Sequence, residues 1–123
     1  MQRKFRLTHS EDFKRVRRSG KSYAHPLVVL IVQNHERPNT PVEYPDIKIG
    51  VTAGRTVGTA VYRNRAKRLL REAMRTFIPN LNSGFDLILI ARPALRSASL
   101  EETRQALLTL LQRAQLLTPL NES

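Results

Sequence analysis

The stretch from Gly54 to Arg75 constrains the fold of this chain most strongly, because apolar residues recur in it at the spacing of a helix. At 100° per residue these side chains fall on one face, as an amphipathic helix packed against a protein core requires. We therefore expect a helix that ends at about residue 78, where Pro79 and Asn80 follow. Its apolar face consists of Tyr62, Ala66, Leu69, Leu70, Ala73 and Phe77.

The same stretch is strongly basic. It contains seven Arg or Lys residues and one acid, Glu72, so its net charge is seven minus one, or +6, of the chain's +11. Surface helices usually mix charges of both signs, so a merely solvated face explains this pattern poorly. Guanidinium groups match pairs of phosphate oxygens, which favours nucleic acid as the partner and anionic lipid as a weaker alternative. Opposite the apolar face lie Asn64, Arg68, Arg71 and Arg75, with Arg65 and Lys67 on the flanks.

Length and composition restrict what the molecule can be. A chain of 123 residues is expected to form one domain, here residues 1–118, followed by a short C-terminal tail at 119–123. The lack of cysteine excludes a disulfide framework, cysteine-based zinc sites and thiol catalysis. No apolar run approaches the roughly 20 residues of a membrane span, and the basic residues 1–7 lack the apolar core of a signal peptide. We therefore expect a cytoplasmic protein with no membrane partner.

The N-terminal half of the chain is expected to form one helix and three strands. Thr8 is followed three residues later by Glu11, which has the form of a capping box, so the helix is expected at about residues 9–18. Three prolines make residues 33–46 a loop, which we expect to connect two antiparallel strands. The expected strands are a short one at 21–25, an aliphatic run at 27–32 and an alternating run at 47–53.

The C-terminal half adds a strand and a helix. The continuous apolar run at 85–91 is typical of a central strand that is covered on both faces. Ser99 and Glu102 form a second capping box, and the helix that follows is expected to end at Thr118 and Pro119. The resulting order is helix, three strands, helix, strand, helix. This order favours an α+β domain in which helices cover one mixed sheet.

Few side chains have the spacing of a catalytic or metal site. His9, His25 and His35 lack ligand spacing and are expected on the surface. The acids are scattered, whereas a metal-dependent nuclease needs several of them to converge on Mg²⁺. Asp86 is unusual because it lies in an apolar strand, where we expect it to cap or pair at the start of that strand. We therefore expect no catalytic residue and no metal ligand in the protein.

Two other features are compatible with RNA binding but also have ordinary structural explanations. Gly54 and Gly58 precede the basic helix, and we expect them to allow a tight turn and the approach of an RNA backbone. The Gly-Lys-Ser/Thr ending of a nucleotide-binding phosphate loop is missing. Phe13 and Tyr23 have ring faces on which single-stranded bases stack, although a core position explains either residue equally well.

The basic helix closely resembles a known signature. Residues 58–72, Gly-Thr-Ala-Val-Tyr-Arg-Asn-Arg-Ala-Lys-Arg-Leu-Leu-Arg-Glu, are similar to the "RNR" motif of the protein subunit of bacterial ribonuclease P. The resemblance extends over nearly the whole chain, including residues 6–13, 20–22 and 86–92. It implies an αβββαβα two-layer sandwich, similar to the second domain of ribosomal protein S5. It also implies a left-handed β-α-β crossover, against the usual right-handed rule.

The resemblance further implies a function. In that family the RNA subunit hydrolyses precursor tRNA to release the 5′ leader, with Mg²⁺ held at the RNA and no cofactor bound by the protein. The protein, expected as one copy per RNA, places its signature helix against the catalytic RNA and holds the leader in a cleft between its first helix and the sheet. Carried over to this sequence, the residues facing the catalytic RNA are Arg55, Arg63, Asn64, Arg65, Lys67, Arg68 and Arg71, and those of the leader cleft are Phe13 and Arg17.

This sequence departs from the family pattern at four positions. Arg17 stands where many members have a second aromatic residue in the cleft, and Ile31 stands where some members have a tyrosine on the strand. We therefore expect less stacking and more charge to hold the leader. Thr56 and Thr59 replace the Lys and Asn that are common before the helix. The alternative is a structural RNA-binding protein of the ribosomal kind. A free-standing metal nuclease is less consistent with the scattered acids.

Overall fold

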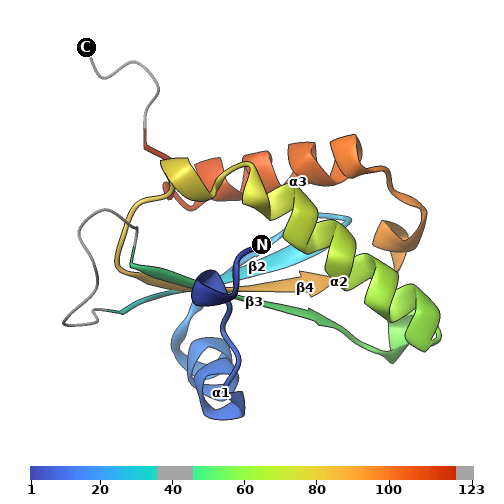
Figure 1. Cartoon of the computed structure of the whole chain (residues 1–123), viewed down its shortest axis with the longest axis horizontal. Coiled ribbons are helices and arrows are strands. Elements are labelled where there is room, and N and C mark those ends of the chain that lie inside the picture. Colours follow the sequence, from blue (N-terminus) through green and yellow to red (C-terminus); the bar gives the residue numbers. More distant parts are fainter. Residues whose placement is uncertain (36–45, 119–123) are drawn as a thin grey trace.

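The computed structural model describes residues 1–35 and 46–118 and confirms the predicted order of elements (Figure 1). The loop predicted at 33–46 lies largely outside the described residues, and the tail predicted at 119–123 lies wholly outside them. Short 3-10 turns, η1 to η4, connect several of the elements. The bounds are η1 (Arg3–Phe5), α1 (Ser10–Ser19), β1 (Lys21–Ala24), β2 (Val28–Asn34), β3 (Ile47–Ala53), η2 (Arg55–Val57), α2 (Ala60–Arg75), η3 (Ile78–Asn80), β4 (Phe85–Ala91), η4 (Pro93–Ser97) and α3 (Leu100–Arg113).

The described strands form one mixed sheet in the order β1-β2-β4-β3. β4 pairs antiparallel with β2 and parallel with β3, so that Ile88 lies opposite Ile31 on one side and Gly50 on the other. The central position predicted for residues 85–91 is therefore confirmed, and five of the seven residues of β4 are buried. β2 and β3 run antiparallel, as predicted for the strands joined by 33–46, but β4 separates them.

The sheet separates a large apolar core from a small one. α2 and α3 cover one face, where apolar residues of the strands and both helices pack together (Figure 1). α1 crosses the opposite face, and its Val16 packs with Ile31 and Ile88 in a second cluster. Because one short helix covers little of this face, Val29 and Ile90 are only partly buried. Part of the α1 face of the sheet is therefore open to solvent.

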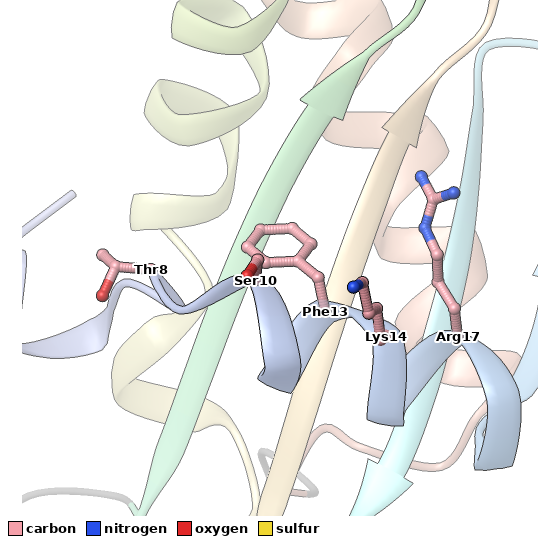
Figure 2. Close-up of a pocket in the computed structure, with 5 residues that line it drawn as sticks. All are labelled: Thr8, Ser10, Phe13, Lys14 and Arg17. Carbon is pink, nitrogen blue, oxygen red and sulfur yellow. The ribbon is translucent and has the colours of Figure 1, made fainter.

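The connection from β3 through α2 to β4 is left-handed, as the resemblance implied. Figure 2 views the sheet from the α1 side, with β3 (green) and β4 (orange) both pointing upward, β4 to the right of β3, and α2 behind the sheet. Seen from the α2 side, the chain moves leftward from β3 to β4, whereas a right-handed crossover moves rightward. With these strand positions, a right-handed connection would have to cross the face that α1 occupies.

The first helix starts within one residue of the predicted position, but its predicted cap is wrong. Thr8 does not cap α1, which begins at Ser10 with His9 as its N-cap and no side-chain capping hydrogen bond. The reason lies just upstream, where the Leu7 N–H donates a hydrogen bond of 2.9 Å to the carbonyl of Ile49. This contact holds the chain extended along the edge strand β3, so His9 and not Thr8 takes the N-cap position.

The predicted end of the last helix at Thr118 is also wrong. α3 ends at Arg113, and Gln115 adopts a positive φ of 58°. This left-handed conformation is a common way to terminate a helix. Leu117 then forms an isolated antiparallel bridge with Leu81, so the chain folds back toward the segment that follows α2.

Candidate nucleic-acid interface

The buried face of α2 is close to the predicted one. Ala66, Leu70 and Ala73 are fully buried in the large core, and Met74, which the periodicity did not include, is fully buried as well. The prediction for Tyr62 is wrong, since this residue is 39% exposed. Its ring packs beneath a cation of η4 instead of entering the core. The helix nevertheless presents one face to the protein and the other to solvent.

The solvent side of α2 presents the predicted basic residues. Glu72, the only acid of the helix, accepts a hydrogen bond of 2.8 Å from Arg75. Within residues 1–35 and 46–118, the other cations of α2 form no ion pair with a carboxylate. The described part of the protein therefore does not compensate most of the charge on this surface. Asn64, Arg65 and Arg68 are exposed, and Arg63, Lys67 and Arg71 are half-buried.

Arg71 extends the basic surface of α2 toward the N-terminal segment. Burial and, second, the positive charge of nearby Arg6 lower the pKa of the Arg71 guanidinium group below its usual value. Arg6 is exposed and forms an isolated parallel bridge with Ile49 on the edge strand β3. No sequence signal predicts this proximity, because the two arginines belong to segments that are far apart in the chain.

η2 forms the tight turn that was predicted around Gly54 and Gly58. Val57, which does not fit the apolar face of the helix, is fully buried and fixes the turn to the core. Gly58 has a φ of 137°, a conformation that residues with a side chain rarely adopt. Arg55 is exposed on the same turn, next to the start of α2. The structure thus brings the predicted lead-in cation and the basic helix to one region of the surface.

A second candidate surface lies beside α1, on the opposite face of the sheet. The ring of Phe13 lies against Gly50 of β3, where an added Cβ would come within 2.5 Å of the Phe13 Cζ atom. Glycine at this position therefore makes room for the ring. Lys14 and Arg17 are exposed on the same helix, so one aromatic ring and two cations share this surface. They form a shallow groove of about 460 Å³, lined by Thr8, Ser10, Phe13, Lys14 and Arg17 (Figure 2).

A buried ion pair anchors α1 to the sheet. Nη2 of Arg15 lies 2.6 Å from Oδ2 of Asp86, which is fully buried on β4. Arg15 also donates hydrogen bonds to Gln33 and, at 3.3 Å, to Asp12. The hydrogen bond with Asp86 is the main cause that raises the pKa of Arg15, and burial opposes it. The expected pairing of Asp86 at the start of its strand is confirmed, and it fixes the helix that holds Phe13.

Two residues considered for base stacking or for the cleft do not line the groove. Tyr23 is partly buried against the large core, with Nζ of Lys21 at 5.5 Å from its ring centroid. Ile31 is buried beneath α1 in the small cluster. Phe13 is therefore the aromatic residue that lines the groove.

The described residues contain neither a group of side chains that could hold a metal ion nor a helix that could span a membrane. In residues 1–35 and 46–118, no three His, Asp or Glu side chains come together in a group that could hold a metal ion. No helix in these segments has both the length and the apolar character needed to cross a bilayer. Of the histidines expected on the surface, His9 is exposed, whereas His25 and His35 are half-buried.

Arg96, a cation of η4, was not predicted to belong to this surface. Its guanidinium carbon lies 3.6 Å from the ring centroid of Tyr62, and its carbonyl accepts a hydrogen bond of 2.9 Å from Arg65. The break after β4 at Arg92 and Pro93 indicates a turn at this point. Nothing in the spacing, however, predicts that this turn meets the start of the basic helix.

Several known proteins are similar to this chain in sequence. The family described as Ribonuclease P matches residues 1–115. A ribonuclease P protein component from Herpetosiphon aurantiacus is 41% identical over 116 residues, which cover 94% of this chain and 89% of the relative. Another, from Chloroflexus aurantiacus, is 35% identical over 125 residues, which cover 100% of this chain and 87% of the relative.

Solved structures show the same fold. The ribonuclease P protein of Thermotoga maritima is similar with a TM-score of 0.73 and 28% identity, over 88% of this chain and 96% of that chain. The ribonuclease P protein of Staphylococcus aureus gives a TM-score of 0.76 over 93% of this chain and 98% of that chain. Its sequence identity is 24%, so this second likeness supports the fold alone.

Proposed function

Because this chain belongs to the ribonuclease P protein family, we propose that it binds the ribonuclease P RNA through α2 and the 5′ leader of precursor tRNA through the groove beside α1. The assembly removes the leader by endonucleolytic cleavage. We assign the cleavage to the RNA subunit and the Mg²⁺ to that RNA. The described residues of the protein bring no three metal-binding side chains together, so they do not fit a metal site of their own.

The observation that supports RNA binding most directly is the uncompensated charge of α2. Its only acid, Glu72, is paired with Arg75, and no described carboxylate pairs with Arg65 or Arg68. RNA phosphates would supply the missing negative charge and release their counterions on binding. A helix that served only to cover the core would not need this density of cations. Together with Arg55, these residues form a surface suited to a phosphate backbone.

The groove beside α1 suits a single strand better than a duplex. It offers one aromatic face, the ring of Phe13 on α1, which lies against Gly50 of β3. The cations Lys14 and Arg17 line the same groove. Stacking on an aromatic ring combined with backbone electrostatics is the usual way of holding single-stranded nucleic acid without strong sequence preference. The leader of precursor tRNA is a single strand, which is why we assign it to this groove.

We further propose one protein per RNA subunit and a cytoplasmic location, where precursor tRNA is processed. The alternative, a structural RNA-binding protein of the ribosomal kind, would share the fold and the basic helix. The relatives and solved structures reported above are ribonuclease P proteins, which favours the role in tRNA maturation.

Reconstitution tests this proposal. The purified protein is added to a bacterial ribonuclease P RNA at low Mg²⁺, and release of the leader from precursor tRNA is measured. We expect the protein to raise the cleavage rate under these conditions and the effect to weaken steeply as salt rises. Absence of any stimulation would contradict the proposal. Recovery of ribosomal RNA alone in a pull-down would support the ribosomal alternative, and cleavage by the protein without RNA would reveal a protein active site.

A further inference from the structure

The turn η4 meets the start of α2 through Arg96. The guanidinium carbon of Arg96 lies 3.6 Å from the ring centroid of Tyr62, which is a cation–π distance. The main-chain carbonyl of the same residue accepts a hydrogen bond of 2.9 Å from Nη1 of Arg65. Tyr62 and Arg65 are three positions apart on the helix and are therefore neighbours on its surface. One residue of η4 thus contacts both of them, next to the basic face of α2.

The backbone around this contact holds Arg96 in place. Leu95, the preceding residue, is fully buried and fixes η4 to the core. At Gly58, an added Cβ would come within 3.2 Å of Tyr62 and 3.3 Å of Nη1 of Arg96. Glycine therefore leaves the space in which the guanidinium group and the ring stack. The position of this cation is set by the turn and the ring.

No described acid explains why these cations are brought together. Arg65 and Arg96 are both exposed, and in the described segments neither forms an ion pair with a carboxylate. The guanidinium group of Arg65 meets the main-chain carbonyl of Arg96, and that of Arg96 lies on the ring of Tyr62, so both positive charges stand in one region of the surface. An anion bound beside them would be attracted by both. The planar fork of a guanidinium group is matched by the paired oxygens of a phosphate. The chemistry of the cluster therefore indicates a phosphodiester.

We propose that Arg96 binds a backbone phosphate of the ribonuclease P RNA beside the phosphates bound by α2, and that Tyr62 is the positioning residue that orients its guanidinium group. This inference rests on the proposed function and adds a turn outside the signature helix to the RNA-binding surface. A purely structural role of Arg96 can be distinguished from phosphate binding by substitution. Arg65 is held by the main-chain carbonyl, which Arg96→Ala retains, so this variant removes the cation without removing that hydrogen bond.

The test is equilibrium binding of the full-length protein to a bacterial ribonuclease P RNA over a range of KCl concentrations, without precursor tRNA. For Arg96→Ala we expect roughly five- to tenfold weaker binding at low salt, and a slope of log K against log salt that is smaller by about 0.7 to 0.9. The matched control is Arg113→Ala. Arg113 is also exposed and also donates to a main-chain carbonyl, that of Ala24 at 3.1 Å, but it lies at the far end of α3. This control should bind like the wild type.

The role of Tyr62 is tested by substitutions that keep or remove the ring. Tyr62→Phe keeps the stack and should bind like the wild type, whereas Tyr62→Leu should weaken binding about two- to fivefold. In the Arg96→Ala background, Tyr62→Leu should have no further effect, because there is no guanidinium group left to orient. Circular dichroism checks that each variant is folded, and Arg96→Gln repeats the charge loss if alanine disturbs the turn.

The outcomes separate this inference from the proposed function. If the wild type binds the RNA and Arg96→Ala equals it in both affinity and salt slope, the inference is wrong and the proposed function stands. If Arg96→Ala changes only the KM for precursor tRNA in the reconstituted enzyme, the phosphate belongs to the substrate and the assignment to the catalytic RNA is wrong. If the wild type itself does not bind ribonuclease P RNA, both are wrong.

Discussion

The carboxylate of Asp86 and the guanidinium group of Arg15 form an ion pair of 2.6 Å that joins the central strand β4 to α1. The side chain of Asp86 is fully buried, and that of Arg15 is 27% exposed. Phe13 and Arg17 flank this arginine on the same helix. The position of the groove beside α1 therefore depends on a polar contact made beneath the helix.

Replacing Arg15 with methionine should destabilise the fold. Breaking a buried ion pair by removing one partner typically costs about 3–5 kcal/mol, and the partial exposure of Arg15 favours the lower end. We expect a decrease of about 3 kcal/mol in the free energy of unfolding, measured by urea denaturation. The exposed cation Arg18 on the same helix provides the control. Arg18→Met should change stability by less than about 0.5 kcal/mol, and equal effects of the two variants would contradict the role of the buried pair.

Gly50→Ala should weaken leader binding by displacing the ring of Phe13. The added Cβ would come within 2.5 Å of the ring, which has to move away from β3. Stacking of one base on an aromatic ring is worth about 1–3 kcal/mol, so we expect roughly tenfold weaker binding of precursor tRNA with a leader and unchanged binding of mature tRNA. Gly54→Ala is the control, because no atom lies within 4 Å of its added Cβ. Similar losses for both variants would show that the ring is not the cause.

Neutralising Arg63, Arg65 and Arg68 together should disrupt assembly with the RNA subunit. If each arginine binds one phosphate, the slope of log K against log salt should fall by about 2 to 3 for the triple glutamine variant. The control is a triple glutamine variant at Lys21, Arg104 and Arg113, which removes the same charge outside α2. A holoenzyme that tolerates the first set as well as the second would contradict the assignment of α2 to the catalytic RNA.

Ser99→Ala should destabilise α3 in a pH-dependent way. The hydroxyl accepts a hydrogen bond from the Glu102 N–H at 3.0 Å, and the Glu102 carboxylate accepts one from the Ser99 N–H at 2.9 Å. Loss of such a cap typically costs about 1 kcal/mol. The hydrogen bond from the Ser99 backbone and, second, one with its side chain lower the pKa of Glu102 below its usual 4.5, and Ser99→Ala keeps the first and removes the second. The carboxylate therefore stabilises the fold above pH 4.5, and this contribution is lost as the pH falls through the lowered value.

Urea denaturation at pH 7 and pH 3 measures this effect. The difference in stability between wild type and Ser99→Ala should become smaller as the pH is lowered from 7 toward 3, because protonation of Glu102 removes the part of the difference that depends on its charge. A difference that stays constant with pH would mean that the hydroxyl alone accounts for the cap.

The two capping boxes show what local sequence can predict. Ser99 and Glu102 form both expected hydrogen bonds, because no other element competes for the chain before α3. Thr8 and Glu11 have the same spacing, but the hydrogen bond between Leu7 and β3 keeps the chain extended past Thr8. The bounds of the strands at 47–53 and 85–91 were predicted to the residue. Their apolar patterns match the burial that each strand has in the sheet, so the sequence pattern and the structure agree.

The candidate site was predictable where it depends on one helix and not where it depends on contacts between elements. The cations of α2 follow from helical spacing, and so does the exposure of Arg65 and Arg68. Tyr62 was assigned to the buried face by the same spacing, but the first turn of the helix meets η4 instead of the core. The proximity of Arg6 to Arg71 could not be predicted either, because it arises from the path of the N-terminal segment along β3.

The left-handed connection between β3 and β4 has a consequence for how two RNAs are arranged. It keeps α2 off the face that α1 occupies, so the two proposed binding surfaces lie on opposite sides of a single sheet (Figure 1). In the proposed complex the leader and the catalytic RNA are held apart by a rigid spacer, whose thickness is that of one sheet and one helix layer. Each RNA is restricted to its own side of the sheet, so the thickness of the protein sets the distance between the leader and the catalytic RNA.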